Sequence, residues 1–149
     1  MKLVNIYTDG ACSGNQNENN IGGWGAVLEF AGHEKELHGG EVNTTNNRME
    51  LTGVISALSA LNQPCVVELF TDSRYIVDAV EKRWVYAWQS RGWMRNRREP
   101  ALNPDLWQAL LTLLERHEVH FHWVQGHAEN EKNNRCDALA VMQREKYQK

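Results

Sequence analysis

Two aspartates stand directly after apolar segments that have the pattern of β-strands. Asp9 follows the apolar part of "NIYTDGACSGN", and Asp72 follows that of "ELFTDSRY". In open α/β sheets, ligand sites lie beyond the carboxyl ends of parallel strands. If these two strands are parallel neighbours, the carboxylates meet at one edge of the sheet. Two close carboxylates repel each other unless one takes a proton or a metal ion neutralises them, so the pattern indicates a cation site.

A structural role is the alternative for either aspartate. The chain has 19 acidic residues, and most of them must be solvated. An aspartate that ends a strand is often a turn former or a helix cap, because its side chain accepts hydrogen bonds from nearby backbone N–H groups. Spacing along the chain does not decide between the two interpretations.

The rest of the pattern predicts the elements that would position these acids. Strands are expected at 3–8, 24–30, within 33–42, at 65–70 and at 119–126, and helices at 46–62, 73–82, 103–117 and 133–146. The nearly continuous apolar run at 65–70 suggests a strand that is buried on both faces. Asn103 is expected to be the N-cap of its helix, with Pro104 at the first helical position. The helix at 73–82 runs into the basic segment that follows it, and the order βββαβαααβα, or one close to it, predicts a mixed sheet with helices packed on it.

Length and composition favour a single domain in the cytoplasm. The 149 residues are 42% hydrophobic and 23% charged, as is ordinary for a globular protein. No apolar run approaches the roughly 20 residues of a membrane span, and no basic-then-apolar leader opens the chain. Three cysteines at unrelated spacings, Cys12, Cys65 and Cys136, fit reduced thiols better than a disulfide framework or a zinc site.

The basic residues of this chain are concentrated in one segment. The formal net charge is −3, but residues 82–98, "KRWVYAWQSRGWMRNRR", hold six basic residues and no acidic residue. Aromatic residues alternate with the arginines, which favours a surface that grips a nucleic-acid strand by phosphate contact and base stacking. The alternative is that the tryptophans are partly core, because tryptophan is usually well buried.

Five segments, in this order, resemble the bacterial type 1 ribonuclease H family: "YTDGACSGN", "TTNNRMEL", "FTDSRYI", "WVQGHAEN" and "NRCDALA". The match runs from about residue 3 to about residue 142. The resemblance implies the α/β ribonuclease H-like fold, a five-stranded mixed sheet with three antiparallel strands and then two parallel ones, flanked by helices. It also implies one catalytic domain over residues 1–149, with a basic, Trp-rich protrusion at about 82–100.

By the same resemblance, four acids bind metal and act in catalysis: Asp9, Glu50, Asp72 and Asp137. His127 is implied to assist proton transfer or product departure, although a histidine in a polar loop can simply be solvated. Oxygen ligands without a convincing His/Cys cluster favour Mg²⁺, with Mn²⁺ as a substitute. Two ions about 4 Å apart would clamp the attacking water and the leaving oxygen.

The resemblance further implies an RNA–DNA hybrid as substrate, with the DNA strand held by the protrusion. The expected substrate-binding residues are Asn15, Thr45, Asn46, Asn47, Trp84, Trp88, Arg91, Arg95, Arg97 and Arg98. Asparagines near the acids can read the 2′-OH, and Thr45 matches a pocket for a DNA phosphate. The loop after Asn15 is longer than is common in the family.

The expected activity is endonucleolytic hydrolysis of the RNA strand of the hybrid, leaving 3′-hydroxyl and 5′-phosphate ends. A monomer with no obligatory protein partner is expected. One alternative is a hybrid-binding module without catalysis, which the presence of all four acids disfavours. The other is a different metal nuclease of the same fold, which the basic segment and "TTNNRMEL" disfavour.

Overall fold

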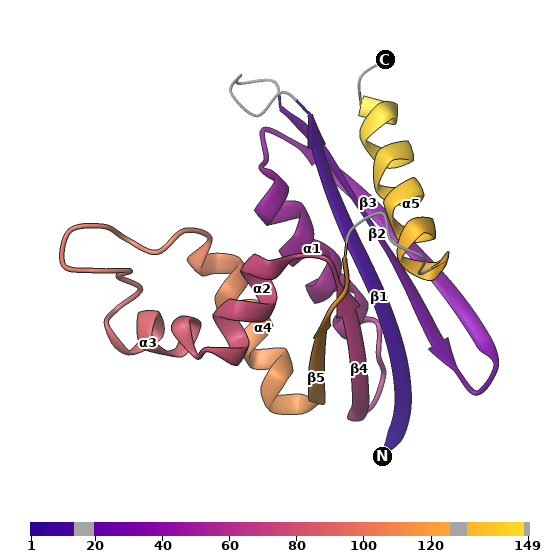
Figure 1. Ribbon diagram of the computed structural model, residues 1–149, viewed down its shortest axis with the longest axis horizontal. Helices are drawn as coiled ribbons and strands as arrows, with labels where there is room; N and C mark the ends of the chain where they lie inside the picture. Colours follow the sequence, from indigo (N-terminus) through magenta and orange to yellow (C-terminus); the bar gives the residue numbers. More distant parts are fainter. Residues whose placement is uncertain (14–19, 126–130, 148–149) are drawn as a thin grey trace.

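A five-stranded sheet with helices on both faces forms the body of the molecule (Figure 1). The computed structural model describes residues 1–13, 20–125 and 131–147. The strands are β1 (Lys2–Ser13), β2 (Ile21–Phe30), β3 (His33–Val42), β4 (Cys65–Thr71) and β5 (Glu118–Trp123). The helices are α1 (Asn46–Ser59), α2 (Arg74–Glu81), α3 (Trp84–Ser90), α4 (Pro104–Arg116) and α5 (Glu131–Tyr147). The predicted order of elements is confirmed.

The sheet has the order β3-β2-β1-β4-β5. β1, β2 and β3 pair antiparallel, whereas β4 pairs parallel with β1 and β5 pairs parallel with β4. The chain returns through α1 before β4, and through α2, α3 and α4 before β5, because a parallel neighbour requires a crossover connection. The expected mixed sheet, with three antiparallel strands followed by two parallel ones, is therefore confirmed.

β1 is longer than its sequence pattern predicts. Asp9 does not end the strand, because β1 stays paired with β2 as far as the Ser13–Ile21 register pair. The parallel ladder with β4, by contrast, stops at Thr8 and Thr71. Asp9 and Asp72 are thus the first residues beyond the parallel ladder, although only Asp72 follows the end of its strand.

The core lies between the sheet and the α1–α4 side of the molecule. The largest of its fully buried side chains include Ile6, Leu58, Leu69, Trp107 and Leu110. On the other face, α5 covers β1, β2 and β3 (Figure 1). In β4, buried residues therefore alternate with half-buried ones, so the expectation that both of its faces are buried is wrong. No helix of the described ranges is long and apolar enough to cross a membrane.

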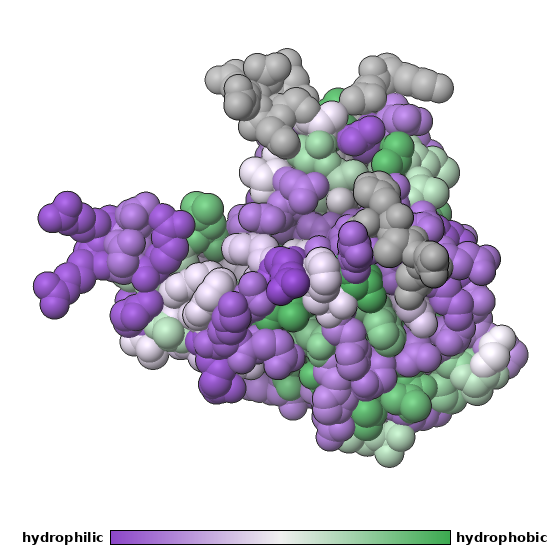
Figure 2. Space-filling view, in the orientation of Figure 1, coloured by the Kyte–Doolittle hydropathy of each residue, from purple (hydrophilic) through white to green (hydrophobic). Residues whose placement is uncertain are grey.

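α3 and the loop that follows it project from the body of the molecule (Figure 1). Figure 2 shows that most of the surface of this projection is hydrophilic. The loop returns to the body at Asn103, which has a left-handed backbone and makes no capping hydrogen bond with its side chain. The prediction that Asn103 is the N-cap of α4 is confirmed, and its carbonyl accepts the first helical hydrogen bond, from the Trp107 N–H at 3.0 Å. Its side chain does not cap the helix and instead accepts a hydrogen bond from Arg48 at 3.2 Å.

Candidate active site

Three carboxylates from three different elements come together at the end of the parallel ladder. Asp9 of β1, Glu50 of α1 and Asp72 after β4 each offer one oxygen, and these oxygens lie within 4.8 Å of one another. Asp9 and Glu50 are buried and Asp72 is half-buried. The three side chains line a cavity of about 370 Å³, together with Asp137. The structure thus places all four sequence-predicted acids around one hollow.

Glu50 reaches this position because α1 begins close to β1. Thr45 caps the helix: its backbone is extended, and its hydroxyl accepts a hydrogen bond from the N–H of Arg48 at 3.2 Å. The N–H of Gly10 donates to the Glu50 carboxylate. A Cβ atom on residue 10 would lie 2.6 Å from the backbone nitrogen of Glu50, so only glycine permits this approach.

Asp137 is placed by the packing of α5 against the sheet. The preceding residue, Cys136, is buried, and its thiol donates to the carbonyl of Tyr7 in β1 at 3.1 Å. A Cβ atom on Gly25 of β2 would lie 2.5 Å from the Cys136 carbonyl oxygen, so the absence of a side chain at residue 25 lets α5 lie close to the sheet. Half-buried Asp137 shares two neighbouring cavities with Asp9 and Asp72.

Burial and mutual repulsion make this cluster costly when all its members are charged. Burial, together with the neighbouring charges of Asp72 and Asp137, raises the pKa of Asp9 to about 7, although the contact with Glu50 lowers it. Burial and the charge of Asp9 hold the pKa of Glu50 well above its usual range. Without a cation, the site therefore retains protons that isolated carboxyl groups would lose near pH 4.

The donor set fits a divalent metal ion. All four candidate ligands are carboxylates, the oxygen donors that hard cations prefer. Glu50 Oε2 is buried and has no hydrogen-bond partner within the described part of the chain. An ion at this oxygen would satisfy it and would also remove the repulsion that raises the two pKa values.

Comparisons with known proteins identify the family of this chain. The family model described as RNase H matches residues 1–145. The chain belongs to the ribonuclease H family. The Ribonuclease H of Desulforamulus reducens is 55% identical over 141 residues, which cover 95% of this chain and 87% of the relative. That of Rhizobium meliloti is 52% identical over 149 residues, which cover 100% of this chain and 95% of the relative.

Solved ribonuclease H structures share the fold. LC9-RNase H1, described as a type 1 RNase H with the type 2 active-site motif, aligns with a TM-score of 0.86 and 36% identity. That alignment covers 98% of this chain and 74% of the other. LC11-RNase H1, solved in complex with RNA/DNA hybrid, aligns with a TM-score of 0.70 and 21% identity, over 98% of this chain and 99% of the other. The resemblance found from the five sequence segments is confirmed.

Of the residues expected to bind substrate in this ribonuclease H, two lie beside the acids. Asn46 and Asn47, in the first turn of α1, line the same cavity as Asp9. Thr45 is exposed at the start of that helix, where its hydroxyl serves as the cap. Asn15 and His127 lie outside the described residues.

The aromatic residues of the basic segment are divided between packing and exposure. Trp88 is half-buried and packs edge-on against buried Trp107, with 6.1 Å between the ring centroids, whereas Trp84 is 43% exposed. Both tryptophans line a largely apolar cavity of about 370 Å³ at the base of the projection, with Arg95. Trp88 therefore fits the interpretation that the tryptophans are partly core, whereas exposed Trp84 remains available to a surface ligand.

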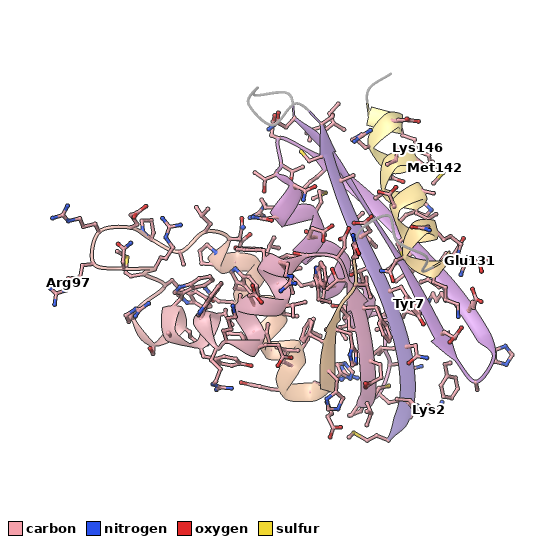
Figure 3. All side chains as sticks on the ribbon, in the orientation of Figure 1. Lys2, Tyr7, Arg97, Glu131, Met142 and Lys146 are labelled. Atoms are coloured by element: carbon pink, nitrogen blue, oxygen red, sulfur yellow. The ribbon has the colours of Figure 1, made fainter. Side chains whose placement is uncertain are left out.

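The four arginines of the projecting loop have different surroundings. The Arg91 guanidinium donates to the backbone carbonyls of Met94 and Arg95, at 3.3 and 3.0 Å, and so shapes the loop. Arg95 forms an ion pair with Glu99. Arg97 and Arg98 are exposed, and Figure 3 shows the Arg97 side chain pointing away from the body at the far end of the loop.

Tyr75 and Arg74 lie at the site but were not among the residues predicted from the sequence. Tyr75 lines both the acidic cavity and the cavity of Trp84 and Trp88, so it joins the two parts of the site. Its hydroxyl accepts a hydrogen bond from buried Trp107 at 3.0 Å. The Arg74 guanidinium lies 4.0 Å from the ring centre of Trp123, whose N–H donates to the Asp72 carbonyl at 3.1 Å. The helical spacing of Tyr75 after Asp72 in "FTDSRY" was the available signal.

Proposed function

We propose that this ribonuclease H is an Mg²⁺-dependent endonuclease that hydrolyses the RNA strand of RNA–DNA hybrids and leaves 3′-hydroxyl and 5′-phosphate ends. The observation that carries the proposal is the convergence of Asp9, Glu50 and Asp72 within 4.8 Å, in a cavity that Asp137 also lines. Relatives named Ribonuclease H and the hybrid bound to LC11-RNase H1 support this substrate.

Asp9, Glu50, Asp72 and Asp137 would hold the metal, two ions per site with substrate, and Mn²⁺ can replace Mg²⁺. When bound, the ions polarise the scissile phosphate and lower the pKa of the attacking water. Asp9 interacts with each of the other three acids, Glu50, Asp72 and Asp137, so it is the ligand proposed to be shared by two ions. The Gly10 N–H fixes one Glu50 oxygen and leaves the other, Oε2, for the metal. His127 is proposed to assist proton transfer or product departure.

The substrate would lie across both cavities. Asn46 and Asn47 line the acidic cavity and would read a 2′-OH beside the scissile phosphate, with Asn15 as a further contact. Thr45 would contact a DNA phosphate, while Trp84 and Trp88 would give apolar surface to the DNA strand. The arginines Arg91, Arg95, Arg97 and Arg98 would add phosphate contacts or shape the loop that makes them. Sugar and phosphate are read rather than base edges, so cleavage should tolerate many sequences.

Residues 1–149 are proposed to act as one catalytic domain, monomeric and without an obligatory protein partner, with residues 82–100 as its protrusion. Cytoplasmic residence is part of the same proposal. Light scattering of the free protein and of its hybrid complex tests the monomer, and fractionation of the source cells tests the location. A stable dimer in both samples would contradict the first point.

The activity is tested with end-labelled RNA–DNA, RNA–RNA and DNA–DNA duplexes, each with Mg²⁺ and with a chelator. We expect cleavage of the RNA strand of the hybrid alone, only with Mg²⁺. Asp9→Asn should bind the hybrid but not cut it, because the shared ligand is lost without removing the binding surface. Hybrid binding by the unaltered chain without any cleavage would refute the proposal, and so would Mg²⁺-dependent turnover by Asp9→Asn.

A further inference from the structure

Two histidines and two glutamates lie together on the sheet, away from the acidic cavity. β5 carries Glu118, His120 and His122 at alternate positions, so all three point to the same face. In the parallel register, Glu68 of β4 stands directly opposite His120. This is the face that α5 covers only over β1, β2 and β3, which leaves these side chains between 30% and 56% exposed.

The two imidazoles are already turned toward carboxylates. His122 Nε2 lies 2.9 Å from Glu68 Oε1, and His120 Nε2 lies 2.9 Å from Glu118 Oε2. Glu68 also stands opposite His120 in the register of the two strands. Glu68 therefore lies between the two imidazoles.

The His122 ring is held in place by stacking. It lies on Phe70 of β4, with 4.9 Å between the ring centroids and 20° between the planes, and Phe70 stacks in turn on Tyr7 of β1. One imidazole of the group is thus oriented before any ligand arrives, which lowers the entropy lost on binding.

We propose that His120 and His122, together with Glu68, bind a divalent transition-metal ion of the Zn²⁺ type. Glu118 supplies a fourth donor, which gives the two nitrogens and two oxygens of a four-coordinate zinc site. Imidazole nitrogens favour Zn²⁺ over Mg²⁺, which prefers oxygen ligands. Among the described residues, only the ligand atoms of Asp9, Glu50 and Asp72 converge as a group of three within 4.8 Å, so the two His–Glu pairs stand apart in this structure. Binding of one ion by both pairs requires the exposed His120 and Glu118 side chains to rotate toward Glu68.

Zn²⁺ bound here would cross-link the edge strand β5 to β4. The two strands lead to Trp123 and Asp72, which are joined by the hydrogen bond from the indole N–H to the Asp72 carbonyl. Binding to the native state alone raises the melting temperature, so occupancy should stabilise this edge of the sheet.

The test is calorimetric titration of Zn²⁺ in excess Mg²⁺, with thermal unfolding as a second readout. His122→Phe keeps a ring to stack on Phe70 but removes both nitrogens, and His120→Gln removes the second imidazole. Each should weaken Zn²⁺ binding by at least about tenfold, since even the loss of an indirect partner of a metal site costs about 10- to 100-fold. His33→Ala, which removes an exposed histidine at the start of β3, is the matched control and should bind as the parent does.

The variant Asp9→Asn distinguishes Zn²⁺ binding at the histidines of β5 from Zn²⁺ binding at the acidic cluster. Zn²⁺ should still bind to Asp9→Asn and raise its melting temperature, and it should do neither for the combination of Asp9→Asn with His122→Phe. Parent-like Zn²⁺ affinity in both His122→Phe and His120→Gln would overturn the proposal. So would complete loss of Zn²⁺ binding in Asp9→Asn alone, because the metal would then belong to the catalytic cluster.

Discussion

Asp9 and Glu50 are acids that burial should disfavour, and they are tolerated because their protons or a cation neutralise them. Burial raises the pKa of both groups, and neighbouring carboxylates raise it further: Asp72 and Asp137 act on Asp9, and Asp9 acts on Glu50. Gly10 makes the arrangement tighter still, because it lets α1 approach β1 and donates its N–H to Glu50. At the scale of single residues, the acids that would bind a metal ion therefore lower the stability of the metal-free protein.

The first prediction concerns the pH dependence of stability without metal. The pKa of Asp9 is about 7 in the native state and about 4 in the unfolded chain, so the native state binds more protons between these values. Stability should therefore fall as pH rises from 4 to 7. Asp9→Asn removes this loss, and should exceed the parent in stability by roughly 1–4 kcal/mol at pH 8 but not at pH 4.

Urea unfolding in chelator at pH 4, 5.5 and 8 measures this difference. Added Mg²⁺ should stabilise the parent at pH 8 and have little effect on Asp9→Asn, because a ligand of the native state adds to its stability. Equal stability of the two proteins at pH 8 in chelator would show that the Asp9 carboxylate is not destabilising.

Gly10→Ala should destabilise the protein and nearly abolish activity. The new Cβ would lie 2.6 and 2.7 Å from backbone atoms of Glu50 and Met49, so α1 must move away from β1. Such overpacking costs roughly 1–3 kcal/mol and would displace Glu50 from the cluster. Gly53→Ala, in the same helix, is the control: its Cβ would meet nothing closer than 3.5 Å, and alanine favours the helix. Gly10→Ala should therefore have a lower melting temperature and a lower rate of hybrid cleavage than Gly53→Ala.

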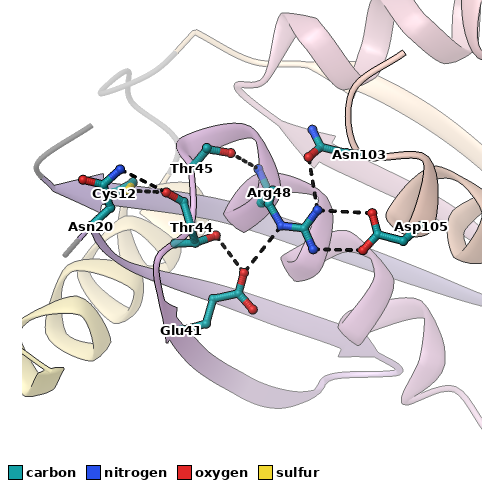
Figure 4. Close-up of polar contacts among 8 residues, drawn as sticks. All are labelled: Cys12, Asn20, Glu41, Thr44, Thr45, Arg48, Asn103 and Asp105. Carbon is teal, nitrogen blue, oxygen red and sulfur yellow. Dashed lines mark hydrogen bonds and ion pairs between the residues drawn. The ribbon is translucent and has the colours of Figure 1, made fainter. Parts of the chain in front are cut away.

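At the scale of elements, Arg48 joins α1 to the start of α4 (Figure 4). Its guanidinium donates two hydrogen bonds to Asp105, at 2.9 and 3.2 Å, and lies 3.7 Å from Glu41 at the end of β3. The Thr44 carbonyl, just before the helix, accepts from Cys12 and Asn20 at the facing ends of β1 and β2. The helix that carries Glu50 and the return from the projecting loop are therefore held by one polar network.

A double-mutant cycle of Arg48→Ala and Asp105→Ala should give a coupling energy of about 1 kcal/mol, because the planar guanidinium binds the carboxylate with two parallel hydrogen bonds. The Lys82–Asp78 pair, 3.8 Å apart and one turn along a helix, is the comparison and should couple by only about 0.3 kcal/mol. Urea unfolding measures both. A coupling at Arg48 no larger than that at Lys82 would mean that this network does not tie the two helices.

At the scale of the whole molecule, the acidic cavity and the arginine-rich projection belong to one surface. Tyr75 lines both cavities, and the projection starts beside the second one. The net charge of −3 hides this asymmetry, since all six basic residues of 82–98 lie on or beside the projection. A phosphate backbone responds to the local field, because salt screens charges beyond about 8–10 Å.

Replacing Arg97 and Arg98 together by Ala should raise KM for the hybrid and leave kcat almost unchanged. The dependence of log KM on log salt should become shallower by about 0.7–0.9 for each phosphate that the variant no longer neutralises. Lys35→Ala with Lys146→Ala removes the same charge from β3 and α5, and should change neither quantity much. Steady-state kinetics at several salt concentrations measure both quantities. An unchanged slope of log KM against log salt in the Arg97/Arg98 variant would show that these arginines do not contact the phosphates of the hybrid.

The order of the elements and the family could be predicted from the sequence, because strand and helix periodicities are local and the five motifs are specific. The same motifs predicted the four acids that the structure brings to one cavity. The length of β1 could not be predicted, because it depends on pairing with β2 beyond Asp9. Nor could the hydrogen bond that the Asn103 side chain accepts from Arg48, a residue of a helix distant in the sequence. Only the tertiary structure brought Tyr75 to both cavities and set His120 opposite Glu68. These are contacts between residues far apart in the chain, and they are fixed by sheet register and helix packing, which no local pattern specifies.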